Sequence, residues 1–178
     1  MKFFLIILIF LMIIVTSISC QVAPAPNESL ELATSTENKV EVTITLEHVN
    51  NDQFVLSATF TPQAPGLHIY SKDIPKTGID GLGRPTLLEL SKDSALLAVS
   101  ELTASVLPQV PVTPPFELLT YPAGPITLSM SILLPDGNHW INDEVIVTYM
   151  ACDEQGCRPP VQQKSIAIKI PGKGLFQQ

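Results

Sequence analysis

A period of two in the apolar side chains limits the folds open to this chain more than any other feature. In the stretch KVEVTITLEHV, the side chains of Val40, Val42, Ile44 and Leu46 are apolar and polar ones separate them. The same alternation recurs in FVLSATF (54–60), PITLSMSILL (125–134) and SIAIKI (165–170). Such alternation places the apolar side chains on one face, as in antiparallel strands with one buried and one wet face.

Three shorter stretches add to the strand count. They are GLHIYS (66–71), TLLELS (86–91) and EVIVTYMA (144–151). Pro and Gly separate the strands throughout, and no segment has the apolar spacing of an amphipathic helix. The count and spacing predict an all-β fold, an immunoglobulin-like antiparallel β-sandwich of seven to eight strands.

One segment breaks this rhythm. Residues 108–125 contain six prolines, including the pair Pro114-Pro115. Proline cannot donate to a strand ladder, so this segment cannot be a central strand. Two interpretations remain, a stiff crossover or protected sheet edge, and a loop that lies over a functional site.

The N-terminus has the layout of a secretory signal. Lys2 precedes the unbroken apolar run Phe3 to Val15, and small residues follow up to Cys20. The run is shorter than the roughly 20 residues of a spanning helix. Ile18-Ser19-Cys20 also resembles the end of a bacterial lipoprotein signal, so we expect lipidation of Cys20. Ordinary cleavage and an uncleaved signal anchor are the alternatives, and each places the rest outside the cytoplasm.

These boundaries predict four parts. Residues 1–19 are the signal peptide, 20–37 a lipid-anchored flexible tether, 38–171 the folded domain and 172–178 a C-terminal tail. The chain has 17 acidic and 10 basic residues, one of which lies in the signal, and no cluster of Lys or Arg. We therefore expect no nucleic acid partner and no strong binding to anionic lipid.

Two cysteines lie five positions apart in YMACDEQGCRPP (149–160). Turn-forming residues separate Cys152 from Cys157, so the thiols are close enough to bond in an oxidising compartment. A disulfide that closes so short a loop stabilises the fold by only about 2 kcal/mol in the chain-entropy model. Three uses remain open from these residues: a redox pair, a structural staple, and a Cu(I) site completed by Met150.

Two blocks resemble a known family. VTYMACDEQGCRPPVQQKSIAIKI (147–170) and PGLHIYSKDIPKTGIDGLGRPTLLELS (65–91) are similar to the N-terminal domain of the thiol:disulfide interchange protein DsbD. The resemblance covers most of residues 38–171. It implies an immunoglobulin-like fold that relays electrons outside the cytoplasm.

The resemblance also implies site residues. Cys152 and Cys157 become the redox pair, with His68 and Tyr70 beside it on one face of a strand. It favours Cys152 as the first cysteine to react, with Cys157 as the alternative.

Charged neighbours have opposing effects on this pair. Asp153 and Glu154 disfavour a thiolate, whereas Arg158 favours it. Arg158 is therefore a further candidate for a residue beside the pair. Met150, which precedes Cys152 by two positions, is another. The family also shields its cysteines with a cap loop, which chain order places within residues 108–121, where Phe116 and Tyr121 are the candidates.

These inferences predict a membrane-tethered thiol–disulfide relay of the protein-disulfide reductase type, with no cofactor and no metal. The family's membrane domain and thioredoxin-like domain have no counterpart in these 178 residues. We therefore expect a separate membrane-embedded or thioredoxin-like electron donor, and clients that carry disulfides. The expected location is extracytoplasmic, on the periplasmic or outer cell-surface side. The alternative is an immunoglobulin-like binding or assembly lipoprotein whose disulfide is structural.

Overall fold

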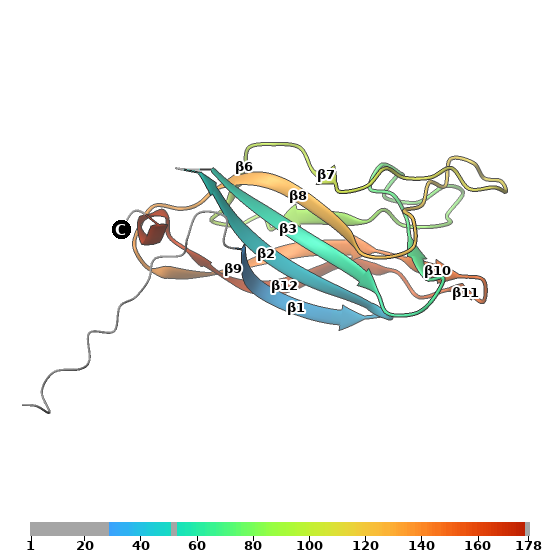
Figure 1. The fold of residues 1–178 in the computed structure, drawn as a ribbon, viewed down its shortest axis with the longest axis horizontal. Helices are drawn as coiled ribbons and strands as arrows, with labels where there is room; N and C mark the ends of the chain where they lie inside the picture. The colour runs from blue at the N-terminus through green and yellow to red at the C-terminus, as the bar shows by residue number, and fades with distance from the viewer. Residues whose placement is uncertain (1–28, 51–52, 177–178) are drawn as a thin grey trace, which may run out of the picture.

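The computed structural model describes residues 29–50 and 53–176, which form facing β-sheets (Figure 1). The larger sheet has the order β1-β2-β3-β8-β6, and β7 also pairs with β8. Its strands are β1 (Ser29–Glu37), β2 (Val40–Asn50), β3 (Gln53–Pro62), β6 (Leu97–Ala98), β7 (Thr103–Ala104) and β8 (Ile126–Leu133).

Two three-stranded sheets complete the fold. One has the order β12-β9-β5 and the other β11-β10-β4, and every pairing is antiparallel. Their strands are β4 (His68–Ile69), β5 (Leu87–Leu90), β9 (Trp140–Tyr149), β10 (Ala151–Asp153), β11 (Gly156–Cys157) and β12 (Val161–Pro171).

The core lies between the inner faces of the six-stranded sheet and the β12-β9-β5 sheet. Val40, Val42, Ile44 and Leu46 of β2 are each at most 1% exposed, as the alternation requires. Their partners across the core include buried side chains of β9 and β12 such as Val145, Val147 and Ile168. The predicted fold class, an all-β, immunoglobulin-like antiparallel sandwich, is confirmed.

The strand count also agrees with the prediction. Seven strands of the described residues have four or more residues, and five have two or three. The stretch GLHIYS is shorter than expected, because β4 covers only His68–Ile69 and Tyr70 adds a single bridge to Thr120.

The expectation of a flexible tether is wrong for residues 29–37. These residues form β1, which pairs with β2 from Ser29 to Glu37 with one register shift between Glu31 and Ala33. Asn38 and Lys39 make the connecting turn, both with positive φ, as two-residue hairpin turns require. Every side chain of β1 is exposed or half-buried, so the strand is held mainly by its backbone pairing with β2. A strand without a buried face leaves no apolar period in the sequence. Residues 1–28, including the expected signal and Cys20, lie outside the described residues.

The C-terminal tail belongs to the fold as far as Phe176. It forms a 3₁₀ helix, η1 (Lys173–Phe176), after β12. The Phe176 ring lies 4.9 Å from that of Phe54 and 5.1 Å from that of His48. Among the described residues, no helix is long and apolar enough to cross a membrane.

The proline-rich segment 108–125 is irregular, as predicted, and runs beside β4. Gln109 and Tyr70 each form a bridge with Thr120, and the Tyr121 N–H donates to the Ile69 carbonyl at 2.9 Å. The segment is therefore joined to the end of the molecule that carries the two cysteines.

Candidate functional site

Cys152 and Cys157 lie directly opposite each other on the hairpin of β10 and β11 and form a disulfide. Their Cα atoms are 4.0 Å apart. The Arg158 N–H donates to the Ala151 carbonyl at 2.8 Å, so the cysteines occupy the adjacent, non-hydrogen-bonded position of the ladder. Side chains approach most closely at such positions, which is why this register brings the two sulfurs together.

The hairpin turn is held by its own residues. Asp153 Oδ1 accepts from the Gln155 N–H at 3.0 Å, and Asp153 Oδ2 lies 2.5 Å from an Arg158 guanidinium nitrogen. Gly156 has a φ of 124°, which favours glycine. Asp153 therefore both shapes the turn and pairs with Arg158.

The two sulfurs differ in their surroundings. Cys152 is 4% exposed, whereas Cys157 is exposed at the hairpin edge. Cys152 forms a small apolar cluster with Tyr70 and Ile74, separate from the main core. Leu118, Leu119 and Met150 pack against this cluster. Cys157 is therefore the more exposed cysteine of the pair, and Cys152 the more enclosed one.

Tyr70 places its hydroxyl at the disulfide. The oxygen lies 3.1 Å from Cys152 Sγ and 3.7 Å from Cys157 Sγ. Disulfide sulfurs carry no hydrogen, so the Tyr70 O–H is the donor. Burial raises the pKa of Tyr70, which keeps this hydroxyl protonated. The Thr86 hydroxyl donates to the Tyr70 carbonyl at 2.6 Å and fixes the backbone there.

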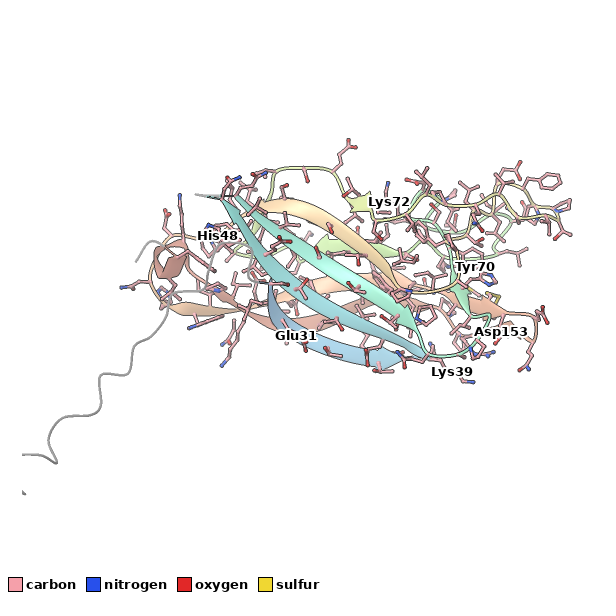
Figure 2. All side chains as sticks on the ribbon, viewed as in Figure 1. Glu31, Lys39, His48, Tyr70, Lys72 and Asp153 are labelled. Atoms are coloured by element: carbon pink, nitrogen blue, oxygen red, sulfur yellow. A yellow bond between two sulfur atoms is a disulfide. The ribbon has the colours of Figure 1, made fainter. Side chains whose placement is uncertain are left out.

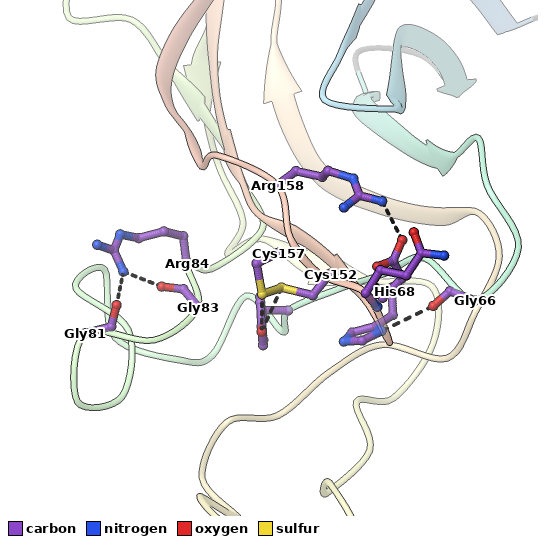
Figure 3. Close-up of a disulfide and its surroundings, with 11 residues drawn as sticks. Gly66, His68, Gly81, Gly83, Arg84, Cys152, Cys157 and Arg158 are labelled. Atoms are coloured by element: carbon purple, nitrogen blue, oxygen red, sulfur yellow. Dashed lines mark hydrogen bonds and ion pairs between the residues drawn. A yellow bond between two sulfur atoms is a disulfide. The ribbon is translucent and has the colours of Figure 1, made fainter.

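His68 lies beside Tyr70. It is the cross-strand partner of Cys152, and its ring meets that of Tyr70 edge-on at 6.1 Å. Its Nδ1 lies 3.4 Å from the Gly66 carbonyl oxygen (Figure 3). The structure therefore brings His68 to Tyr70, and Tyr70 to the sulfurs.

A second loop, residues 76–84, reaches the same cluster. A Cβ on Gly83 would lie 2.7 Å from Leu118 Cδ1 and 3.3 Å from Tyr70 Cδ1. Arg84 holds this loop by donating to the carbonyls of Gly81 and Gly83 (Figure 3). It also donates to the Thr77 carbonyl. Gly83 is therefore needed for close packing against the tyrosine ring.

The charges expected to compete at the pair neutralise each other. Arg158 and Asp153 form an ion pair with side chains that are 22% and 13% exposed. The Arg158 Nε is buried and has no hydrogen-bond partner among the described residues. Asp153 therefore holds the Arg158 guanidinium across the hairpin turn.

Tyr121 and Phe116, the two cap-loop candidates, are not among the residues of the Cys152 cluster. Tyr121 is 1% exposed within the main core, where its hydroxyl accepts from the Lys72 N–H. Phe116 is 53% exposed. Leu118 and Leu119 of the same segment pack against the Cys152 cluster instead. Leu118, Leu119 and Ile74 were not singled out from the sequence, because apolar side chains in an aperiodic stretch carry no distinguishing pattern.

The arrangement permits thiol–disulfide exchange at one accessible sulfur. The partner sulfur is buried beside a hydrogen-bond donor. In the described part of the chain, no group of three or more His, Cys, Asp or Glu side chains could hold a metal ion. Figure 2 shows Tyr70 and Asp153 at one end of the sandwich and His48 at the other.

No protein-family model and no curated protein matches the sequence. Among solved structures, the crystal structure of the Neisseria meningitidis DsbD N-terminal domain in the reduced form is similar to this chain. The TM-score is 0.45 and the sequence identity 17%, over 76% of this chain and 87% of that one. This similarity concerns the arrangement of the chain and assigns no role to any residue.

Proposed function

We propose that this chain is an extracytoplasmic thiol–disulfide relay whose redox centre is the Cys152–Cys157 pair. The observation that carries the proposal is the asymmetry of the disulfide: Cys157 is exposed, whereas Cys152 is buried with its sulfur 3.1 Å from the Tyr70 hydroxyl. An exchange reaction needs one sulfur open to attack and one able to leave as a thiolate. The pair combines both.

Reduction proceeds through two displacements. A donor thiolate attacks Cys157 Sγ, the disulfide breaks, and its electron pair leaves on Cys152 Sγ. The Tyr70 hydroxyl donates a hydrogen bond to this thiolate, which burial would otherwise destabilise. The second thiolate of the donor then attacks the donor sulfur of the mixed disulfide and releases Cys157 as a thiolate. The donor leaves as a disulfide.

Delivery to a client reverses these steps. The Cys157 thiolate attacks a client disulfide and releases one client thiolate. The Cys152 thiolate then attacks Cys157 Sγ, which restores the internal disulfide and releases the second client thiolate. Two electrons pass from donor to client, and solvent supplies protons to the thiols. The relay itself uses no cofactor.

The hairpin argues against a purely structural disulfide. Backbone pairing already joins β10 to β11, and the Asp153–Arg158 ion pair spans the same turn. A covalent bond across such a closed turn adds little to the loop-closure term. The binding-lipoprotein alternative would have to rest on a different surface.

The proposed location is the extracytoplasmic face of a membrane, with Cys20 as the lipidated residue. A tether keeps the domain near a membrane-embedded or thioredoxin-like donor, which raises the effective concentration of the pair at that donor. Donor and client are separate protein chains in this proposal.

A redox titration tests the proposal. The full chain with Cys20→Ser, kept in mild detergent, is equilibrated with glutathione and thioredoxin couples, and the disulfide fraction is read by thiol labelling. We expect a potential between those of thioredoxin and the glutathione pool. A potential below about −300 mV, the range of structural disulfides, rejects the relay.

A further inference from the structure

An apolar groove lies at the end of the sandwich opposite the disulfide. It has a volume of about 370 Å³ and is lined by Leu30, Leu46, Trp140, Pro171, Leu175 and Phe176. Figure 1 shows η1, which supplies Leu175 and Phe176, at one end of the long axis and β10 and β11 at the other. Function at the disulfide makes no use of this groove.

The groove exposes large apolar side chains, which are usually buried in a soluble domain. Trp140 is 53% exposed and Leu30 38% exposed. A second hollow of about 430 Å³ continues the first and shares both of these side chains. Contiguous exposed apolar surface of this kind marks a contact site.

We infer that this groove rests on the membrane surface, with Trp140 seated in the headgroup region. The inference rests on the proposed membrane tether. The described chain begins at Ser29, which itself lines the groove, and only nine positions separate it from Cys20. Nine residues reach at most about 30 Å, so a lipid on Cys20 holds the groove close to the bilayer.

The side chains suit a bilayer interface. Tryptophan prefers the interface because its ring is apolar and its N–H can bond to water or headgroups. The second hollow carries one acid and one base, Glu31 and Lys169. This balanced rim fits a zwitterionic surface, whereas the acidic chain as a whole would be repelled by an anionic one.

This contact sets the orientation of the redox pair. The 11-residue strand β2 runs between the two ends of the sandwich and spans about 35 Å. With the groove on the bilayer, the disulfide faces away from it at about that height. The donor must then present its thiols well above the membrane surface.

The sequence supplies a clean reporter, because Trp140 is the single tryptophan of the chain. The full chain is reconstituted into phosphatidylcholine vesicles that carry a doxyl group at a shallow or a deep position of the lipid. We expect shallow labels to quench Trp140 fluorescence more than deep ones. Leu30→Glu should remove most of this quenching, and Leu175→Glu serves as a second variant.

Val112→Glu is the matched control, because Val112 is 96% exposed on the segment beside the cysteines. It should leave the quenching unchanged. Circular dichroism melts verify that each variant folds. If the chain floats with the vesicles but Trp140 is not quenched, the tether stands and the groove inference is overturned.

Two other outcomes also reject the inference. One is a Trp140 emission that depends on the protein-to-lipid ratio without quenching, which indicates a second copy in the groove. The other is a chain that does not float with vesicles, which also removes the tether. The redox titration described above does not depend on any of these three outcomes of the vesicle experiment, so it detects a failure of the relay separately.

Discussion

The hydroxyl of Tyr70 lies 3.1 Å from the sulfur of Cys152, inside a cluster that excludes water from that sulfur. A disulfide sulfur is a weak acceptor, whereas a thiolate is a strong one. The bond therefore strengthens on reduction. Tyr70 stabilises the reduced state more than the oxidised state.

Tyr70→Phe should lower the reduction potential of the pair. Loss of one hydrogen bond to the leaving sulfur, worth about 1–2 kcal/mol, corresponds to roughly 20–40 mV. The pKa of Cys152 in the reduced protein should rise, since its thiolate loses a donor. Redox titration and a pH series of the Cys152 alkylation rate in a Cys157→Ser background measure both effects.

Tyr121→Phe is the control for that experiment. Its hydroxyl accepts from the Lys72 backbone and belongs to the main core. A structural effect of tyrosine loss would lower the melting temperature of both variants and leave both potentials unchanged. Equal potentials for Tyr70→Phe and the parent chain would remove Tyr70 from the mechanism.

Cys157 should be the cysteine that forms mixed disulfides. Cys152→Ser leaves the exposed thiol, so it should trap a covalent adduct with oxidised thioredoxin that non-reducing gels detect. Cys157→Ser leaves only Cys152, which is 4% exposed. This variant should form the adduct at least about tenfold more slowly. Adducts that form equally fast with both variants would contradict the assignment.

Asp153 and Arg158 should shift the reactivity of Cys157 in opposite directions. Asp153→Asn keeps an oxygen for the turn and removes the negative charge, so the guanidinium acts on the thiolate alone. We expect alkylation of reduced Cys157 at neutral pH to rise about three- to tenfold. Arg158→Gln should slow it by a similar factor. Iodoacetamide rates across a pH series give the measurement, and parallel shifts in both variants would refute this account.

Alkaline stability should depend on Tyr149. Burial, with a smaller effect of Glu37, raises the pKa of Tyr149 from 10.0 to about 12. The unfolded chain ionises this group from pH 10 and the folded chain only near pH 12, so the stability it provides is complete below pH 10 and lost as the pH rises towards 12. This loss is on the order of 2–3 kcal/mol.

Tyr149→Phe should flatten that alkaline decline. The variant loses the hydrogen bond from its hydroxyl to the Glu37 carbonyl, so its stability at neutral pH falls by about 1 kcal/mol. Urea unfolding at several pH values separates the two effects. A decline of unchanged steepness in the variant would assign the alkaline loss to other groups.

The sequence was sufficient for the strands β2, β3, β8 and β12, because period-two alternation depends only on which face is buried. Leu46 and Leu56, for example, are directly paired and fully buried. Strand β1 escaped prediction because its side chains remain largely exposed. The strand forms because β2 offers an unpaired edge with which the backbone of β1 can make hydrogen bonds.

The site was predictable only in part, for a similar reason. The cysteine spacing indicates a hairpin, and the i, i+2 relation of His68 and Tyr70 indicates a shared face. Whether a given sulfur is buried depends on Leu118 and the loop around Gly83, which reach the hairpin from distant parts of the chain. No local pattern encodes that contact.

The hairpin of β1 and β2 is fastened to the residues that follow the Cys152–Cys157 disulfide. The Asn38 side chain donates to the Pro159 carbonyl at 2.7 Å, and Glu37 pairs with Lys164 of β12 at 2.7 Å. A pull between the N-terminal end of β1 and a partner held at Cys157 would load β1 along its length. Its ladder to β2 would then resist in shear, with many hydrogen bonds sharing the force. In the proposed relay, a client bound at one end and a lipid anchor at the other would therefore pull on the domain without separating these strands one hydrogen bond at a time.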